Sequence, residues 1–440
     1  MEHEENVSRS KRPRRNPVHE DADPTPKASR HTRSIKTPKP TPFSLRSRVA
    51  DAVPHLPQPV DPDPPPRLPV GTGETHAKTP SRTKSISVSS TRSQPRSRSP
   101  TKRMVELLAA DKKVERHGAQ EGIRSLPTKM QELHARIHKV AAYAKGIVPM
   151  EIADDVARTA AVAEPLDPDI SVARERSQLS LDALQDQLKT LISIQAESTM
   201  CANENLNEAS WNERVQYPML RETVRHRPDV HVYNITTAKP LKELVPDNRY
   251  GDATAKKMVD YGITLGNKQL QADVIDRLGA CTSLDMRRTI NPTSYDPLCH
   301  RPLAISIETK TPSGGDEEEA MVQLCIWVTA HFNRLRNLLP AGERDGPLEI
   351  ALPLILVSGP RWSLFFAHDT QDCIVSLICT FYNYLLARLT CFQSLVTSTT
   401  MGETSTLLGC YKVLCALGML CAWAEKEYAE WFRETILTPE

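Results

Sequence analysis

The chain of 440 residues carries a formal net charge of +2, 35 prolines and ten cysteines. The near-neutral charge is a cancellation, because residues 1–103 hold 21 Lys+Arg against 10 Asp+Glu while the remainder carries −9. No uninterrupted apolar run reaches the roughly 18 residues of a membrane-spanning helix, and the acidic start MEHEE lacks the apolar core of a secretory signal. The cysteines all follow Met200 without zinc-site spacing, so we expect reduced thiols in an intracellular protein.

Residues 1–103 form a basic tail that is rich in proline and serine. The tail offers almost no apolar surface to offset chain entropy, so we expect it to be disordered. A compact basic cluster within it is typical of segments that nuclear import receptors bind, although a solvated charge run is the alternative. The cluster consists of Lys11, Arg12, Arg14 and Arg15. We therefore expect nuclear localisation, with the tail adding non-specific contacts to nucleic-acid phosphates.

Residues 104–200 are predicted to form a helical extension. Apolar side chains recur at helical spacing over 128–146, and again over 181–196, which predicts two helices. A protein-interaction scaffold is an alternative role for this region, although no specific motif supports it.

A third helix is predicted from about residue 205. One of its faces carries, at steps of three, four and four residues, Glu208, Trp211, Val215 and Met219. If Trp211 and Val215 face the core, Glu208 faces inward with them, and a buried carboxylate must be paired or coordinated. The alternative is a glutamate that the helix dipole favours in the first turn. The helical pattern alone leaves both interpretations open.

Residues 201–440 are predicted to form one α/β domain, with a mixed central sheet flanked by helices. A strand over 257–265 carries Asp260, and a second strand over 302–310 ends in Glu308 and Lys310. A helix with Gln323 follows the turn at 314–315. The strands 352–357 and 362–367 then form a hairpin around Gly359, and a helix over 405–432 closes the chain.

The two strands with acidic residues predict a particular chemistry. Side chains alternate along a strand, so Glu308 and Lys310 project from the same face, about 7 Å apart. Two carboxylates on neighbouring strands, Asp260 and Glu308, supply the hard oxygen ligands that Mg²⁺ prefers. Such an ion can activate water for attack on a phosphodiester, while Lys310 orients the water and helps to deprotonate it. Burial and the metal would lower the pKa of this lysine. The alternative is a surface cross-strand pair between Glu308 and Lys310.

An ordered run of motifs over roughly 120–435 resembles the PD-(D/E)XK nuclease superfamily, and more closely the fungal "PD-(D/E)XK nuclease-like" family. The run as a whole is far more specific than any one motif. Its members are Glu208-Ala209-Ser210-Trp211-Asn212, Val215, Pro218-Met219-Leu220, Val259-Asp260-Tyr261, Ile290-Asn291-Pro292, Pro302 to Lys310, Gln323-Leu324-Cys325-Ile326-Trp327, Gly402-Glu403-Thr404, Gly409-Cys410-Tyr411, Trp423, Tyr428 and Trp431.

The resemblance implies a restriction-endonuclease-like fold and a Mg²⁺- or Mn²⁺-dependent nuclease that acts on DNA. It implies metal ligation by Asp260 and Glu308, and catalytic roles for Lys310, for Glu208 on the metal side, and for Gln323. The residue before Asp260 is valine instead of the proline of the family name. An alternative that the resemblance allows is a catalytically inactive domain of this fold that binds nucleic acid or protein in the nucleus.

Residues 375–393 are interpreted as a retained intron. Their first two codons can read GTA-AGT, as in a fungal splice donor. Their last five codons can read CTA-ACA-TGT-TTT-CAG, which would supply a branch point and an acceptor. The segment is in frame, and its removal joins Ile374 to Ser394. We therefore expect it to add nothing to the shared core; the alternative is an amphipathic helix packed on the sheet.

Overall fold

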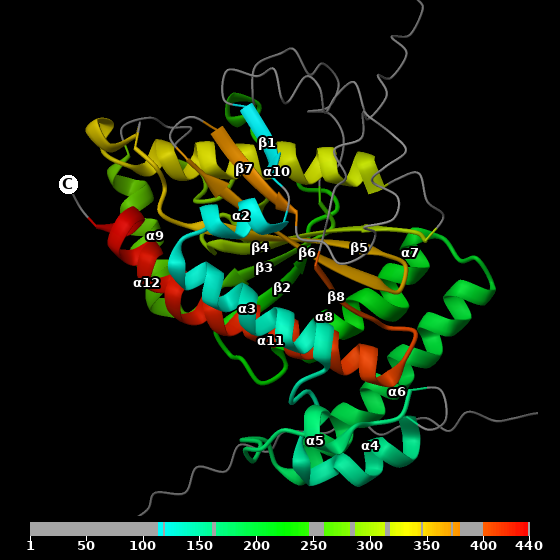
Figure 1. Ribbon diagram of the computed structural model, residues 1–440. Coiled ribbons are helices and arrows are strands. Elements are labelled where there is room, and N and C mark those ends of the chain that lie inside the picture. Colours follow the sequence, from blue (N-terminus) through cyan, green and yellow to red (C-terminus); the bar gives the residue numbers. More distant parts are fainter. Residues whose placement is uncertain are drawn as a thin grey trace, which may run out of the picture. The chain divides into compact units, whose positions relative to one another are not determined.

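The computed structural model describes residues 113–117, 119–160, 164–245, 259–281, 287–312, 317–344, 346–370, 373–378 and 399–438 (Figure 1). They all belong to one compact unit of the chain. The basic tail over 1–103, with its cluster at Lys11, lies outside the described residues, as do residues 379–393 of the proposed intron.

A mixed sheet forms the centre of the described unit, as the sequence predicts. Its strands follow the order β1-β7-β6-β5-β4-β3-β2, and β8 pairs with β6 beside that path. The pairs β4–β5 and β1–β7 are parallel and the others antiparallel. The strand bounds are β1 Lys113–His117, β2 Val230–Asn234, β3 Tyr261–Leu265, β4 Leu303–Lys310, β5 Ala351–Ser358, β6 Arg361–Asp369, β7 Cys373–Ile378 and β8 Thr399–Glu403.

The central strands β4 and β5 are buried along almost their whole length. Such continuous burial is typical of strands that are covered on both faces. The predicted hairpin is confirmed, because β5 and β6 pair in antiparallel fashion up to Ser358 and Arg361. Gly359 in its turn has a φ of +55°, a conformation that glycine adopts without strain.

Helices cover the sheet on two sides (Figure 1). α10 packs against β4 and β5, whereas α3 and α11 pack against each other and against β8. The main helices are α2 Ala119–Ser125, α3 Thr128–Tyr143, α4 Ala153–Ala160, α5 Pro168–Ser171, α6 Leu181–Asn203, α7 Glu208–Trp211, α8 Tyr217–Val224, α9 Lys268–Ala280, α10 Glu317–Leu338, α11 Leu407–Trp423 and α12 Ala429–Trp431. Short π-helical segments join some of them at Asn212–Gln216, Ala424–Tyr428 and Phe432–Leu437.

The helices predicted to start at residues 128 and 181 are α3 and α6. The hydroxyl of Ser180 accepts a hydrogen bond from the Ala183 N–H, which caps the start of α6. Both helices come from the predicted extension, yet both pack on α11, the last long helix of the chain. The extension and the α/β domain therefore share a core.

The structure corrects three details of the sequence interpretation. Lys113–His117 forms strand β1 instead of helix, and it pairs with β7. Asp260 lies immediately before β3 instead of within it. Residues 375–378 extend β7, which pairs with β6, so the expectation that the 375–393 segment adds nothing to the sheet is wrong for these four residues. The strand starts upstream at Cys373, and the exposed edge of β6 offers backbone groups that a following strand can pair with.

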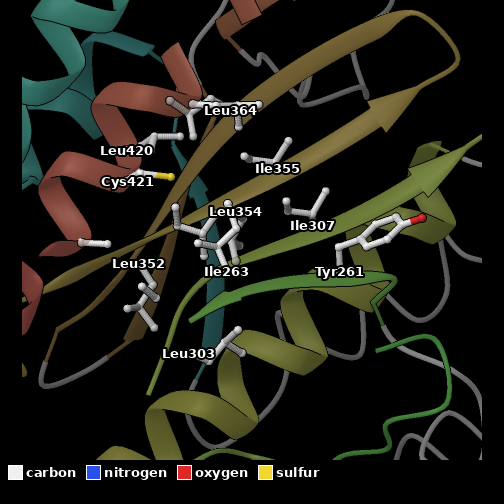
Figure 2. Packing of buried hydrophobic residues seen from close by; sticks show 14 of the residues in the cluster. Tyr261, Ile263, Leu303, Ile307, Leu352, Leu354, Ile355, Leu364, Leu420 and Cys421 are labelled. Carbon is white, nitrogen blue, oxygen red and sulfur yellow. The ribbon is translucent and has the colours of Figure 1, made fainter. Parts of the chain in front are cut away.

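The C-terminal helix Leu407–Leu437 is long and apolar enough to cross a membrane by composition, but 72% of its apolar stretch is buried within the protein. Figure 2 shows Leu420 and Cys421 of α11 facing sheet residues such as Leu352 and Leu354. The helix is therefore part of the hydrophobic core. The cysteines among the described residues are free thiols, as predicted, and most of them are buried.

His331 in α10 predicts a pH dependence of stability. Its side chain is 2% exposed, and burial lowers its pKa to about 3. An unfolded histidine titrates near pH 6.5, so between about pH 6.5 and 3 the unfolded chain binds a proton that the folded chain does not. The unfolding free energy should therefore fall as the pH falls through that window.

We expect His331→Leu to lose about 2 kcal/mol of the stability difference between about pH 7 and pH 5, measured by urea unfolding. The exposed His226 provides a matched control through His226→Leu. Equal pH dependence in the two variants would contradict the prediction.

Candidate active site

The end of β4 places Glu308 and Lys310 together. Glu308 is 2% exposed, and the side chain of Lys310 is 11% exposed. The Lys310 ammonium forms an ion pair with the Glu308 carboxylate, and its Nζ also donates to the Thr309 carbonyl at 2.9 Å. The prediction that these two side chains lie on the same face is therefore confirmed, and the pair is buried instead of lying on the surface.

Asp260 is fixed between β3 and β4. Its side chain is fully buried, and its Oδ2 accepts hydrogen bonds from the Thr309 N–H at 3.0 Å and the Thr309 hydroxyl at 2.7 Å. Its own N–H donates to the Ile307 carbonyl at 2.9 Å. The carboxylate of Asp260 is thus held against the residue that separates Glu308 from Lys310.

Glu208 reaches the same place from the helical side. It is the first residue of α7, whose start is capped by the Asn207 side chain accepting from the Ser210 N–H. Its Oε2 lies 3.6 Å from the Lys310 Nζ, and its side chain is 34% exposed. Both interpretations of Glu208 hold, because it lies in the first helical turn and also pairs with a cation of the site.

Gln323 lies near the start of α10 and is half-buried. Its Oε1 is buried, and among the described residues it finds no hydrogen-bond partner. The structure thus brings Asp260, Glu308, Lys310 and Glu208 together, whereas the described contacts do not join Gln323 to them. Its role in the site stays a prediction from the family resemblance.

The pKa of Lys310 in the protein without a bound ion depends on the carboxylates around it, whereas the lowering expected from the sequence concerns the site with a bound metal and stays a prediction. Burial by itself lowers the pKa of Lys310, but the nearby carboxylates of Glu308, Glu208 and Asp260 raise it by more, so the pKa is raised overall. The lysine is a cation that partly neutralises a group of carboxylates. The expected lowering would need a positive charge beside it, which the protein residues named here do not supply.

The donor set fits a divalent cation by its chemistry. Asp260 and Glu308 offer carboxylate oxygens, which are the ligands that Mg²⁺ prefers. Three carboxylates face one ammonium in this cluster, and buried negative charge is costly until a cation neutralises it. Within the described ranges, however, no three His, Cys, Asp or Glu side chains already form a ready-made metal site. The ammonium of Lys310 supplies part of the positive charge that neutralises these carboxylates.

Two residues of the site were missed from the sequence. Thr309 holds Asp260, although a strict strand alternation points it away from Glu308 and Lys310. Gln216 is fully buried in the π-helical segment, and its Nε2 donates to the Gly359 carbonyl at 3.1 Å. The Gly359 N–H in turn donates to the Lys310 carbonyl at 2.8 Å. The central position of the Glu-x-Lys motif could have drawn attention to Thr309, whereas only the fold brings Gln216 to the hairpin turn.

Thr309→Val should lower the unfolding free energy by about 1.5–3 kcal/mol, because it removes the hydroxyl donor from the buried Asp260 carboxylate and keeps the side-chain shape. Thr309→Ser retains the hydroxyl and serves as the matched variant. Urea unfolding of both proteins measures the difference. A valine variant as stable as the wild type would show that this hydrogen bond contributes nothing.

A model of the PD-(D/E)XK nuclease superfamily matches residues 157–429, which is more than half of the chain. The match contains the four residues that converge in the site: Glu208, Asp260, Glu308 and Lys310. A search of curated proteins gives no match. The mixed sheet with helices on two sides agrees with that family, as do Asp260 immediately before β3 and Glu308 and Lys310 at the end of the neighbouring strand β4. The chain belongs to the PD-(D/E)XK nuclease superfamily.

Proposed function

We propose that the protein is a nuclease that hydrolyses DNA phosphodiesters with Mg²⁺ or Mn²⁺ as cofactor. The observation that carries this proposal is the buried Lys310 ammonium between the carboxylates of Glu308 and Glu208, near Asp260, which immediately precedes the neighbouring strand β3. Membership of the PD-(D/E)XK nuclease superfamily supports it.

Each residue of the cluster has a role in this proposal. Asp260 and Glu308 would hold the divalent ion, which when bound stabilises the negative charge that develops on the phosphate. Lys310 is placed to orient the attacking water and to donate a hydrogen bond to the developing charge. Glu208 positions Lys310 from the helix, and Gln323 is assigned a catalytic role by the family resemblance alone.

The decisive experiment is cleavage of supercoiled plasmid by the purified chain, with Mg²⁺ or Mn²⁺ and with EDTA. We expect metal-dependent nicking that falls by about a hundredfold or more in Lys310→Met. Lys129→Met changes an exposed lysine that lies 3.8 Å from Glu430, and it should cleave like the wild type. Circular dichroism confirms that each variant is folded. Undiminished cleavage by Lys310→Met would remove the proposed site.

A catalytically inactive module that binds nucleic acid or protein is the second candidate. Two observations favour it: the part of the chain after residue 103 carries a charge of −9, whereas a nuclease surface usually has a basic stripe, and Lys310 is already paired with Glu308. Binding of several DNA substrates by the wild type without cleavage of any of them would favour this candidate over the enzyme.

Nuclear localisation through an import receptor is proposed from the sequence of the tail. Four basic residues support it: Lys11, Arg12, Arg14 and Arg15. A fluorescent fusion of residues 1–103 should accumulate in nuclei, and changing the four residues to alanine should abolish the accumulation. Nuclear accumulation that persists in the alanine variant would assign the signal elsewhere.

A further inference from the structure

Tyr217 presents an exposed aromatic ring nine residues after Glu208 in the chain. It is the first residue of α8 and is 39% exposed. Its ring lies nearly parallel to the ring of Tyr261, with 6.2 Å between the centroids and an interplanar angle of 14°. Tyr261 follows Asp260 in the chain and is 2% exposed. The exposed ring is therefore stacked on the residue next to a proposed metal ligand.

The inner ring of this pair, Tyr261, is buried and hydrogen-bonded. The Tyr261 hydroxyl donates a hydrogen bond to the Asn212 carbonyl at 3.3 Å. Asn212 lies between Glu208 and Tyr217 along the same helical segment, so that segment carries both a residue of the site and the exposed ring. Figure 2 shows Tyr261 at the border of the apolar cluster, with its hydroxyl directed away from Ile307. A fixed ring loses little conformational entropy when a ligand stacks on it.

A free positive charge accompanies the ring. The guanidinium carbon of Arg221 lies 6.0 Å from the Tyr217 ring centroid, and the residue is exposed. Nearby arginines are paired: Arg214 with Glu197 at 2.9 Å, and Arg225 with carboxylates of its own. Arg221, in contrast, makes no ion pair within the part of the chain that the structure describes. Its charge is available to a phosphate.

We propose that Tyr217 and Arg221 form a subsite for an unpaired nucleotide of the substrate. The base stacks on the exposed face of Tyr217, in place of the loosely associated guanidinium, and Arg221 contacts a neighbouring phosphate. A base in a duplex is stacked between its neighbours and cannot lie on the ring, so the substrate is single-stranded or frayed at this position. The inference rests on the proposed function, and it adds the strandedness of the nucleic acid. The simpler alternative is a cation–π pair that only stabilises the helix surface.

The test is binding of a short fluorescein-labelled single strand of DNA to the full chain in EDTA, measured by fluorescence anisotropy. Stacking on an aromatic side chain is worth about 1–3 kcal/mol per base, so Tyr217→Ala should weaken binding about fivefold to a hundredfold. Tyr217→Phe keeps the ring and should bind like the wild type. The matched control is Tyr143→Ala, because Tyr143 is 62% exposed on α3 and contacts His138.

Duplex DNA of the same sequence should bind without dependence on Tyr217. The corresponding RNA strand tells which sugar the subsite accepts, and dependence on Tyr217 with either single strand supports the subsite. Dependence with neither strand overturns it, and so does an equal loss of affinity in Tyr217→Ala and Tyr143→Ala.

Binding and cleavage report on the two proposals separately. If the wild type binds single strands through Tyr217 but never cleaves with Mg²⁺, the subsite stands and the nuclease proposal fails. If it cleaves plasmid but binds single strands without regard to Tyr217, the nuclease proposal stands and the subsite fails.

Discussion

Asp260→Asn is expected to slow plasmid cleavage by about a hundredfold or more while the chain stays folded. The asparagine keeps an oxygen that can accept the two hydrogen bonds from Thr309, which are 2.7 and 3.0 Å long in the wild type. It loses the negative charge with which a carboxylate binds a divalent cation. The initial rate of nicking at saturating Mg²⁺ measures the effect.

Asp276→Asn is the matched control, because Asp276 lies exposed on α9 and undergoes the same chemical change. Thermal unfolding gives a second readout that does not depend on activity. Mg²⁺ should raise the melting temperature of the wild type and of Asp276→Asn, because a ligand that binds only the folded state stabilises it, and should raise that of Asp260→Asn less. Wild-type rates and an unchanged Mg²⁺ effect in Asp260→Asn would exclude Asp260 as a metal ligand.

Gly409→Ala should cost at least about 2 kcal/mol of unfolding free energy. A Cβ on Gly409 would lie 1.9 Å from the carbonyl oxygen of Glu403, at the end of β8, and that backbone cannot shift without displacing the strand. Gly402 in β8 is equally close to the helix. A Cβ on Gly402 would lie 2.7 Å from the carbonyl oxygen of Gly409. The two glycines let β8 and the start of α11 approach each other closely.

Gly418→Ala is a control in the same helix. No neighbouring atom lies within 4 Å of the new Cβ, and alanine favours helix over glycine by up to about 1 kcal/mol. This variant should therefore be as stable as the wild type or slightly more stable, when both are unfolded in urea. Similar losses in Gly409→Ala and Gly418→Ala would mean that the close approach to Glu403 does not matter.

The parts of the fold that could be predicted are those with a strong local signal. Helices α3 and α6 start where the apolar spacing indicates, and the hairpin β5–β6 follows from two apolar runs around Gly359. Strands β1, β2 and β8 were not predicted. They have five residues each, and their pairing partners lie far away in sequence, so only the assembled sheet defines them.

The residues of the candidate site likewise fall into two groups: those that a local pattern or the family resemblance predicts, and those that only the fold brings together. Glu308 and Lys310 meet because alternation along one strand is a local rule, and the family resemblance identifies Asp260. In the protein without a bound ion the pKa of Lys310 is raised, because carboxylates converge there from β4, from α7 and from the residue before β3, and no local pattern gives that number; the lowering expected with a bound metal stays a prediction. The buried link from Gln216 to Gly359 joins residues 143 positions apart, and no pattern in the sequence signals it.

Strand β6 pairs along one edge with two strands, β8 and β7. This division matters for the retained intron that we interpret at residues 375–393. Leu364 and the residues before it pair with β8, whereas Phe365–Asp369 pair with β7. The β8 half adjoins the hairpin turn, where the Thr404 N–H donates to the Pro360 carbonyl at 2.9 Å. Splicing out residues 375–393 would remove residues 375–378 of β7, and with them the pairing of β1 with residues 375–377 and of β6 with residues 375–378. The two products would then differ at the β1–β7 margin of the sheet, whereas Glu308 and Lys310 lie on β4, away from that margin in the strand order.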